Sequence, residues 1–348
     1  MKTTSLKKYL LPTIGCVVVI IAVFYYYFFM SFSAKDATSY IYIDKDDNVD
    51  SVCAKLKPLT DTHCMHAFNT LVRHSSYADN IRTGRYAIKP GEGTLKVFRH
   101  LKNGMQDPVA LTIPSVRTIG DMAHAVSTKM LIDEEELYDS LKDEAFCEKY
   151  GYDTCTIACI FIPNTYDIYW NASIGKFMDR MQKESKKFWN EERTRKATAM
   201  GFTPEQVITL ASIVDEETAN NAEKPMVAGM YYNRLKFRDA EYPDGMPLQA
   251  DPTIKFAWQQ FELKRIYNKL LYIDSPYNTY KNTGLPPGPI RIPSVAGIDA
   301  VLNYAHHNYL YMCAKEDFSG THNFAVTYNE HLKNAAKYSK ALNEHGIH

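Results

Sequence analysis

Three consecutive acids, Asp215, Glu216 and Glu217, end an apolar run in the segment LASIVDEETAN (210–220). A carboxylate near the C-terminus of a helix faces the negative end of the helix dipole, which is mildly unfavourable. Burial against apolar neighbours favours the protonated form of a carboxyl group. A carboxyl group that stays neutral near pH 7 can donate a proton to the departing oxygen of a glycosidic bond. The segment is therefore a candidate site for general acid catalysis.

A helix that starts at residue 204 is expected to carry these acids. Thr203 can be its N-cap, Pro204 suits the first helical position, and Gln206 completes a capping box. Apolar residues then recur at i, i+3, i+4 and i+7 and define a buried face, namely Val207, Leu210, Ala211 and Val214.

The phase of this helix separates the three acids. At about 100° per residue, Glu217 falls at the margin of the apolar face and should be half-buried. Glu216 points to the opposite side, with Thr209 and Ser212, and should be exposed. Asp215 lies between them. The phase therefore nominates Glu217 as the candidate acid.

Two interpretations of Glu217 remain open at this stage. An ordinary glycosidase needs a second carboxylate as nucleophile or base, and Asp215 and Asp251 are the candidates. Alternatively, Glu217 is a structural, partly buried acid that Arg234 or another cation holds in place.

Metal and nucleotide cofactors are not expected. The histidines include the adjacent pair His306 and His307 and the isolated His322, without H-E-x-x-H or C-x-x-C spacing. Neither G-x-S-x-G nor a P-loop nor G-x-G-x-x-G occurs.

Residues 9–30 form an uncharged apolar run that is long enough to span a bilayer, which takes about 20 residues. Lys2, Lys7 and Lys8 precede the run, whereas Lys35 is balanced by Asp36 on the far side. The positive-inside rule therefore places residues 1–8 in the cytoplasm and the rest of the chain across the membrane. A cleaved signal peptide is the competing interpretation. The run is too long for one and no clean cleavage site follows, which favours an uncleaved anchor.

The composition is that of a globular protein with about two domains. Lys+Arg and Asp+Glu both number 40, and this zero net charge argues against nucleic acid as the main partner. An oxidising compartment permits disulfides, but their pairing cannot be read from sequence, and free thiols remain an equal alternative. Six cysteines lie outside the apolar run: Cys53, Cys64, Cys147, Cys155, Cys159 and Cys313.

Residues 31–106 are expected to form a small module. Strands are predicted at 39–43 and 85–88, and helices at 49–56, 67–72 and 95–101, the last ended by Gly104. This βααβ order suits a small sugar-binding module or a structural spacer.

Residues 107–348 form a larger region, with strands at 109–113 and 308–314 and helices at 119–129, 133–143, 174–200, 203–217 and 327–343. The expected fold class is α+β.

Five blocks in the C-terminal third carry a family resemblance. They are ITLASIVDEET, EKPMVAGMYYNRL, MPLQADPTIKFA, YNTYKNTGLPPGPI and YLYMCAKEDFSGTHNF, in this order. Together they closely resemble the YceG-like (MltG) endolytic murein transglycosylase family, strongly from residue 203 onward. The resemblance is weaker upstream, through RTGRYAIKPGEGTL and FIPNTYDIYWN.

The resemblance implies a membrane-tethered lyase with a LysM-like module (31–106) before an α+β catalytic domain (107–348). The substrate would be peptidoglycan, cut between MurNAc and GlcNAc in nascent strands to leave 1,6-anhydroMurNAc ends and help terminate elongation. The enzyme would sit in the inner membrane through residues 9–30, with the catalytic domain periplasmic. It would need no cofactor, and peptidoglycan synthases would be candidate partners.

The resemblance also assigns residues. The essential glutamate of the family's E-x-E-T motif corresponds to Glu217, and Asp215 replaces the motif's first Glu. In a lytic transglycosylase the sugar's C6 hydroxyl attacks the anomeric carbon, so one residue can act as acid and then as base. Asp215 is expected to raise the pKa of Glu217. The candidate substrate-binding residues are Asp215, Asn233, Arg234, Gln249, Asp251, Tyr277, Asn278, Tyr280 and His322.

Residues 238–244 (RDAEYPD) depart from the family pattern and are expected to form a surface loop at the edge of the cleft. Two alternative functions stay open. One is a non-catalytic scaffold that binds glycan. The other is a hydrolase that activates water with Asp215 or Asp251.

Overall fold

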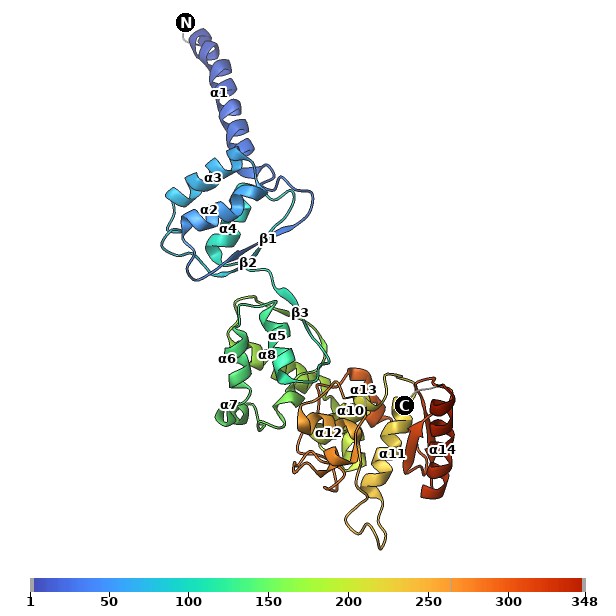
Figure 1. The fold of residues 1–348 in the computed structure, drawn as a ribbon. Helices are drawn as coiled ribbons and strands as arrows, with labels where there is room; N and C mark the ends of the chain where they lie inside the picture. Colours follow the sequence, from blue (N-terminus) through green and yellow to red (C-terminus); the bar gives the residue numbers. More distant parts are fainter. Residues whose placement is uncertain (1–2, 264, 346–348) are drawn as a thin grey trace. The chain divides into compact units, whose positions relative to one another are not determined.

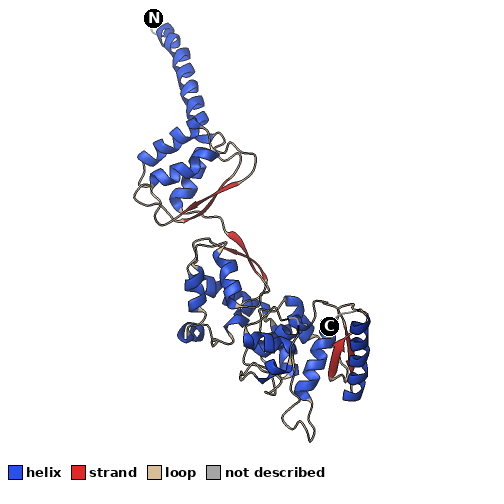
Figure 2. Cartoon of the chain, in the orientation of Figure 1, coloured by secondary structure: helices blue, strands red, loops and turns tan. Residues whose placement is uncertain are grey.

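The computed structural model describes residues 3–263 and 265–345, and its chain divides into two compact units (Figure 1). The first unit contains the residues up to Leu111 together with Lys129–Leu131 and Asp167–Ser173. The second contains Thr112–Thr128, Ile132–Tyr166 and the chain from Ile174 onward. Helices dominate both units, and the strands that the structure describes form three separate two-stranded sheets (Figure 2).

The first helix, α1 (Thr3–Phe29), includes the predicted membrane-spanning run. Its segment Leu10–Phe29 has a mean hydropathy of 2.1, and none of it is buried within the protein. By length and composition this segment can cross a bilayer. Residues 1 and 2, at the start of the predicted cytoplasmic segment, lie outside the described residues.

The strand–helix–helix–strand order predicted for the small module is present. It consists of β1 (Ser39–Ile43), α2 (Val49–Leu56), η1 (Lys57–Leu59), α3 (Thr62–Arg73), β2 (Gly84–Ile88) and α4 (Thr94–Asn103). The strands β1 and β2 are antiparallel, with Ser39 opposite Ile88. Gly104 ends α4 in the left-handed conformation, at φ 68°, which glycine adopts without steric penalty.

After the small module, the chain continues through a pair of strands and a series of helices. The strand β3 (Val109–Ile113) pairs with β4 (Asn164–Ile168). The helices between and after these strands are α5 (Ile119–Ser127), α6 (Glu134–Ser140), α7 (Glu144–Lys149), η2 (Ile157–Ile160), α8 (Ile174–Phe188) and α9 (Glu191–Met200). The single helix predicted for 174–200 is therefore wrong. Asn190 breaks it, because its side chain accepts a hydrogen bond from the Arg193 amide and caps a new helix.

The core of the second unit surrounds α10 (Pro204–Glu217). The remaining elements are α11 (Lys224–Lys236), α12 (Asp251–Trp258), η3 (Asn268–Tyr272), α13 (Val295–Leu302), β5 (Tyr311–Ala314), β6 (His322–Ala325) and α14 (Tyr328–Glu344). The strands β5 and β6 are antiparallel. The predicted capping box of Thr203 and Gln206 is confirmed, with both reciprocal hydrogen bonds formed.

The predicted polar face of α10 is wrong. Every residue from Val207 to Val214 is buried, including Thr209 and Ser212. Both hydroxyls are satisfied locally, because Thr209 donates to the Glu205 carbonyl and Ser212 donates to the Thr209 carbonyl. Ser212 also accepts from the Ile290 amide. The helix is thus enclosed on all sides rather than half-exposed.

Two further expectations concern the loop at 238–244 and the cysteines. Residues 238–244 form a loop outside regular secondary structure whose residues are mostly exposed, as predicted. All seven cysteines lie among the described residues and are free thiols in the structure.

The capping box yields a stability prediction. Replacing Thr203 with Ala removes the acceptor for the Gln206 amide and should lower the free energy of unfolding by about 1 kcal/mol. Replacing Thr203 with Ser keeps the acceptor and should retain most of the stability. Urea denaturation followed by circular dichroism measures both variants. Equal losses in the two variants would contradict the capping role.

Candidate functional site

The C-terminal end of α10 delivers Glu217 into a pocket of about 340 Å³. The helix ends there because Thr218, its C-cap, turns into an extended conformation at φ −142°. The pocket is also lined by side chains from α11, α12, β5, β6 and α14 and from the loops around residues 248 and 280. Segments that are far apart in the sequence therefore surround the side chain of Glu217.

Glu217 is a half-buried acid, as its helical phase predicted, and its pKa is elevated. Burial raises its pKa from 4.5 to about 7, and the nearby Asp251 carboxylate raises it as well. A hydrogen bond from Tyr231, with Lys255 and Arg234 at longer range, acts in the opposite direction. The Tyr231 hydroxyl lies 2.5 Å from Oε1 of Glu217. Because this hydroxyl donates to Oε1, the neutral carboxyl group carries its own proton on Oε2.

Arg234 lies in the same pocket but makes no hydrogen bond or ion pair with Glu217. Its guanidinium donates to the carbonyls of Leu310 (2.6 Å) and Leu248 (2.8 Å) and to Oε1 of Gln249 (3.3 Å). Gln249 adopts φ 50°, a left-handed conformation that is strained for a non-glycine residue. Arg234 therefore supports the backbone that carries Gln249, and the interpretation in which it holds Glu217 as an ion-pair partner is not observed.

Asp251 and Tyr280 form a second carboxylate–hydroxyl pair that lines the pocket. The Tyr280 hydroxyl donates to Oδ1 of Asp251. Burial and the Asp251 charge raise the pKa of Tyr280, so its phenol keeps its proton. The pocket thus holds one neutral carboxyl group, Glu217, with the carboxylate of Asp251 near enough to affect it.

Two histidines complete the lining. The Nδ1 atom of His322 lies 3.1 Å from Oε2 of Glu223, which also accepts the His322 amide through Oε1. The Nδ1 atom of His331 is buried and has no hydrogen-bond partner among the described residues. Burial lowers the pKa of His331, which favours the neutral ring. His331 and Tyr231 were missed by the sequence analysis, because no local pattern distinguishes them from the other histidines and tyrosines.

Asp215 lies outside this pocket in a buried ion pair. Its Oδ1 atom is 2.7 Å from Nζ of Lys224, and the two side chains are only 3% and 7% exposed. It also accepts hydrogen bonds from the amide and hydroxyl of Ser294. A Cβ at Gly297 would lie 2.4 Å from Asp215 Oδ1, so no larger residue fits there without movement. The nearby carboxylate that raises the pKa of Glu217 is that of Asp251. Asp215 is held by Lys224 and Ser294, and the influence on Glu217 expected of it stays a prediction.

Three other predicted residues also lie outside the pocket. Asn233 donates to the carbonyls of His307 and Tyr309. Asn278 is fully buried and donates to the carbonyls of Leu271, within η3, and of Ile273, just after it. Tyr277 lines a separate, larger cavity. Their side chains organise the surrounding loops, as Asn and Tyr commonly do.

Glu216 is the third acid of the triplet, and its predicted exposure is wrong. Its side chain is 11% exposed and lies between two arginines. Nε of Arg117 is 3.0 Å from Oε1 of Glu216, and Nη1 of Arg291 is 2.8 Å from the same atom. Glu216 therefore ties the end of α10 to the segments around residues 117 and 291.

The described residues contain no group of three or more His, Cys, Asp or Glu side chains that could hold a metal ion. The side chains that line the pocket can supply proton transfer by Glu217 and hydrogen bonding from the surrounding hydroxyl, amide and imidazole groups.

The chain is similar to known proteins over most of its length. The model of the YceG-like family matches residues 41–337. The chain is 28% identical, over 326 residues, to the endolytic murein transglycosylase of Bacillus subtilis (strain 168), covering 88% of this chain and 86% of that protein. It is 26% identical to the endolytic murein transglycosylase of Streptococcus pneumoniae serotype 2, covering 78% of this chain and 53% of that protein. It thus spans about half the length of the streptococcal relative.

The fold has a relative of known structure. The crystal structure of a YceG-like protein from Listeria monocytogenes, at 2.6 Å, superposes with a TM-score of 0.55 and 25% sequence identity. The likeness covers 86% of this chain and 99% of that chain.

The ion pair of Asp215 yields a stability prediction. Replacing Asp215 with Asn leaves the buried ammonium of Lys224 without its counter-charge and should lower the free energy of unfolding by about 3 kcal/mol. A double variant, Asp215→Asn with Lys224→Met, removes both charges and should be more stable than the single variant. Urea denaturation measures the two. A single variant as stable as the wild type would contradict the pairing.

The hydrogen bond to Glu217 yields a titration prediction. Replacing Tyr231 with Phe removes the donor that stabilises the carboxylate, so the pKa of Glu217 should rise above about 7. Carbon-13 NMR of the labelled Glu217 side chain measures the shift, and Tyr232→Phe, at the next position of α11, is the matched control. An unchanged or lower pKa in the Tyr231 variant would show that the hydroxyl does not stabilise the carboxylate.

Proposed function

Because this chain belongs to the YceG-like family, we propose that it is a peptidoglycan lytic transglycosylase in which Glu217 is both acid and base. The observation that carries the proposal is the buried carboxyl group of Glu217, whose pKa is raised to about 7. The names of the relatives from Bacillus subtilis and Streptococcus pneumoniae support the substrate class.

A pKa near 7 suits a group that must both give and take a proton. In the first step, Oε2 of Glu217 donates its proton to the glycosidic oxygen as the bond from the MurNAc anomeric carbon breaks. In the second, the C6 hydroxyl of the same MurNAc attacks that carbon, and Glu217 takes the hydroxyl proton. The product is a 1,6-anhydroMurNAc end, no water is consumed, and Glu217 returns to its starting state. The substrate N-acetyl group helps to stabilise the cationic centre.

The alternative function, hydrolysis, needs a second carboxylate that activates water, and Asp251 lines the pocket beside Glu217. Asp215 is engaged by Lys224 and Ser294, which leaves Asp251 as the candidate base for hydrolysis. Asp251 accepts a hydrogen bond from Tyr280 and interacts electrostatically with Glu217. In the proposed lytic reaction, Asp251 and Tyr280 bind sugar hydroxyls, and the Asp251 charge stabilises the positive charge at the anomeric carbon.

The proposal extends to the cellular setting. The length and composition of α1 support a single-pass anchor in the inner membrane, with a cytoplasmic N-terminus and a periplasmic catalytic domain. The small module at 31–106 would be LysM-like and hold glycan near the membrane. Cleavage of nascent strands at this position would help to terminate elongation, beside peptidoglycan synthases as partners.

The function is tested by incubating the protein with purified glycan strands and identifying the new ends by mass spectrometry. The wild type should produce anhydro ends. Glu217→Gln should lower the rate by roughly 10²- to 10⁴-fold, because the general acid is lost. Glu205→Gln, near the start of the same helix, is the control and should keep full activity. Reducing ends would indicate hydrolysis, no cleavage by the wild type would indicate a scaffold, and an active Glu217→Gln variant would falsify the assignment.

The pH dependence of the same reaction provides a separate test. The protonated form of Glu217 is the catalytic acid, so kcat/KM should fall as pH rises through about 7. Rates of formation of anhydro ends between pH 5 and 9 measure this basic limb. A rate that stays constant across pH 7 would contradict the role of Glu217 as the acid.

A further inference from the structure

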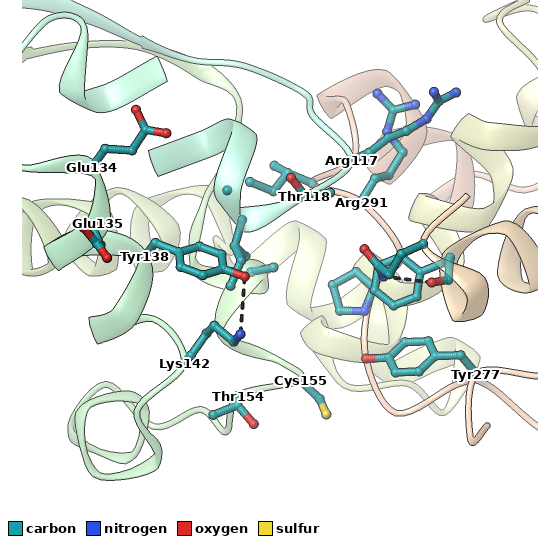
Figure 3. Close-up of a pocket in the computed structure, with 17 residues that line it drawn as sticks. Arg117, Thr118, Glu134, Glu135, Tyr138, Lys142, Thr154, Cys155, Tyr277 and Arg291 are labelled. Carbon is teal, nitrogen blue, oxygen red and sulfur yellow. Dashed lines mark hydrogen bonds between the residues drawn. The ribbon is translucent and has the colours of Figure 1, made fainter. Parts of the chain in front are cut away.

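A second cavity, of about 860 Å³, lies in the same unit and shares no lining residue with the Glu217 pocket (Figure 3). Its walls come from the start of α5, from α6, from the loop at 154–158, from the end of α12 and from residues 289–292. Of the predicted site residues, only Tyr277 lines it.

The two cavities both border α12, and an ion pair connects the end of α10 to the wall of the larger one. Glu217 lines the smaller one, whereas the neighbouring Glu216 binds Arg117 and Arg291, which line the larger one. On α12, Asp251 lines the smaller cavity and Phe256 the larger one. Five residues of helix span roughly 8 Å. Asp251 and Phe256 therefore place the two cavities roughly 8 Å apart along the axis of α12.

The cationic side chains of Arg117, Lys142 and Arg291 line this cavity. Arg117 and Arg291 both pair with the carboxylate of Glu216. Glu262 and Asp121 also interact electrostatically with Arg117. The buried Nε of Arg291 has no hydrogen-bond partner among the described residues. Nζ of Lys142 lies 3.3 Å from the Tyr138 hydroxyl, and no carboxylate of the described chain pairs with it. These groups suit the carboxylates of a ligand.

Acidic groups lie on the other side of the cavity. Figure 3 shows Glu134 and Glu135 on α6, away from Arg117 and Arg291. Glu134 already binds His124, with 2.7 Å between Nδ1 and Oε2, whereas Glu135 has no ion-pair partner within the described residues. Glu135 is therefore available to a ligand ammonium group. The rings of Phe256 and Tyr277 add apolar surface.

A ligand for this cavity must thus carry carboxylates, an amine and apolar groups. A neutral sugar does not need these charges, and Glu134 and Glu135 would repel a polyanion. We propose that the cavity binds the peptide attached to MurNAc, so that the enzyme recognises the peptide as well as the glycan. This proposal rests on the proposed function, because the peptide reaches the cavity as part of the strand. Such peptides carry free carboxylates and the amine of a diamino acid.

The experiment compares two substrates, glycan strands that retain their peptides and strands from which an amidase has removed them. The full chain in detergent is assayed for anhydro ends with Glu135→Gln, with Lys142→Met and with two control variants on α7, Glu144→Gln and Lys149→Met. The exposed positions of all four side chains leave folding intact. The Glu135 and Lys142 variants should raise KM roughly three- to fivefold on peptide-bearing strands, with kcat unchanged and no effect on stripped strands. The controls should match the wild type on both.

The outcomes separate this proposal from the proposed function. A KM that is unchanged, or that rises equally on both substrates, overturns peptide recognition while leaving the transglycosylase reaction in place. If the wild type forms no anhydro ends from either substrate, the proposed function fails. Calorimetric titration with the amidase-released peptide then tests separately whether the cavity binds the peptide. Binding to the wild type that weakens in Glu135→Gln and Lys142→Met supports the cavity as a peptide site. No binding to the wild type overturns it.

Discussion

The burial of α10 from Val207 to Val214 organises the packing of the second unit. A helix with Val, Ile, Leu and Ala along most of its length must be covered on all sides, and α11, α13 and the neighbouring segments cover it. Its polar residues Thr209 and Ser212 bond to the helix backbone, so they can be enclosed as well. The last residue of the helix therefore emerges from the core into a pocket, where Glu217 is largely removed from water.

The three acids at this end of α10 divide two tasks between them. Asp215 pairs with Lys224 and Glu216 pairs with Arg117 and Arg291, so these two acids fasten the helix end to its neighbours. Glu217 accepts a hydrogen bond from the Tyr231 hydroxyl and contacts no cation, and burial raises its pKa. The pKa of Glu217 is about 7 in the folded protein and 4.5 without burial. The folded state is therefore favoured by the protonated carboxyl group, and this contribution to stability is lost as pH rises from about 4.5 through 7. The same burial that makes Glu217 suited to proton transfer thus lowers stability above this range.

The two cavities are linked through those same fastening contacts. The arginines that neutralise Glu216 also line the larger cavity, so one cluster of charges holds the helix end and forms a binding wall. In the proposed function, the glycan of a branched substrate would lie at Glu217 and its peptide at the second cavity.

Features that depend on neighbouring residues could be predicted from the sequence. The capping box at Thr203, the end of α4 at Gly104, the strands β1 and β2 and the apolar run in α1 were all predicted, because helix caps, glycine conformation and periodicity act over a few residues. Helical phase and the family blocks together nominated Glu217.

The tertiary structure alone decided which groups each side chain meets. Phase predicted an exposed Glu216 and a polar Thr209 face, and both expectations failed because residues about 75 to 100 positions away cover them. The pairing of Asp215 with Lys224, the donation from Tyr231 and the unpartnered nitrogen of His331 had no local signal either. Burial and charge neighbours set a pKa, and both arise only when distant segments pack together.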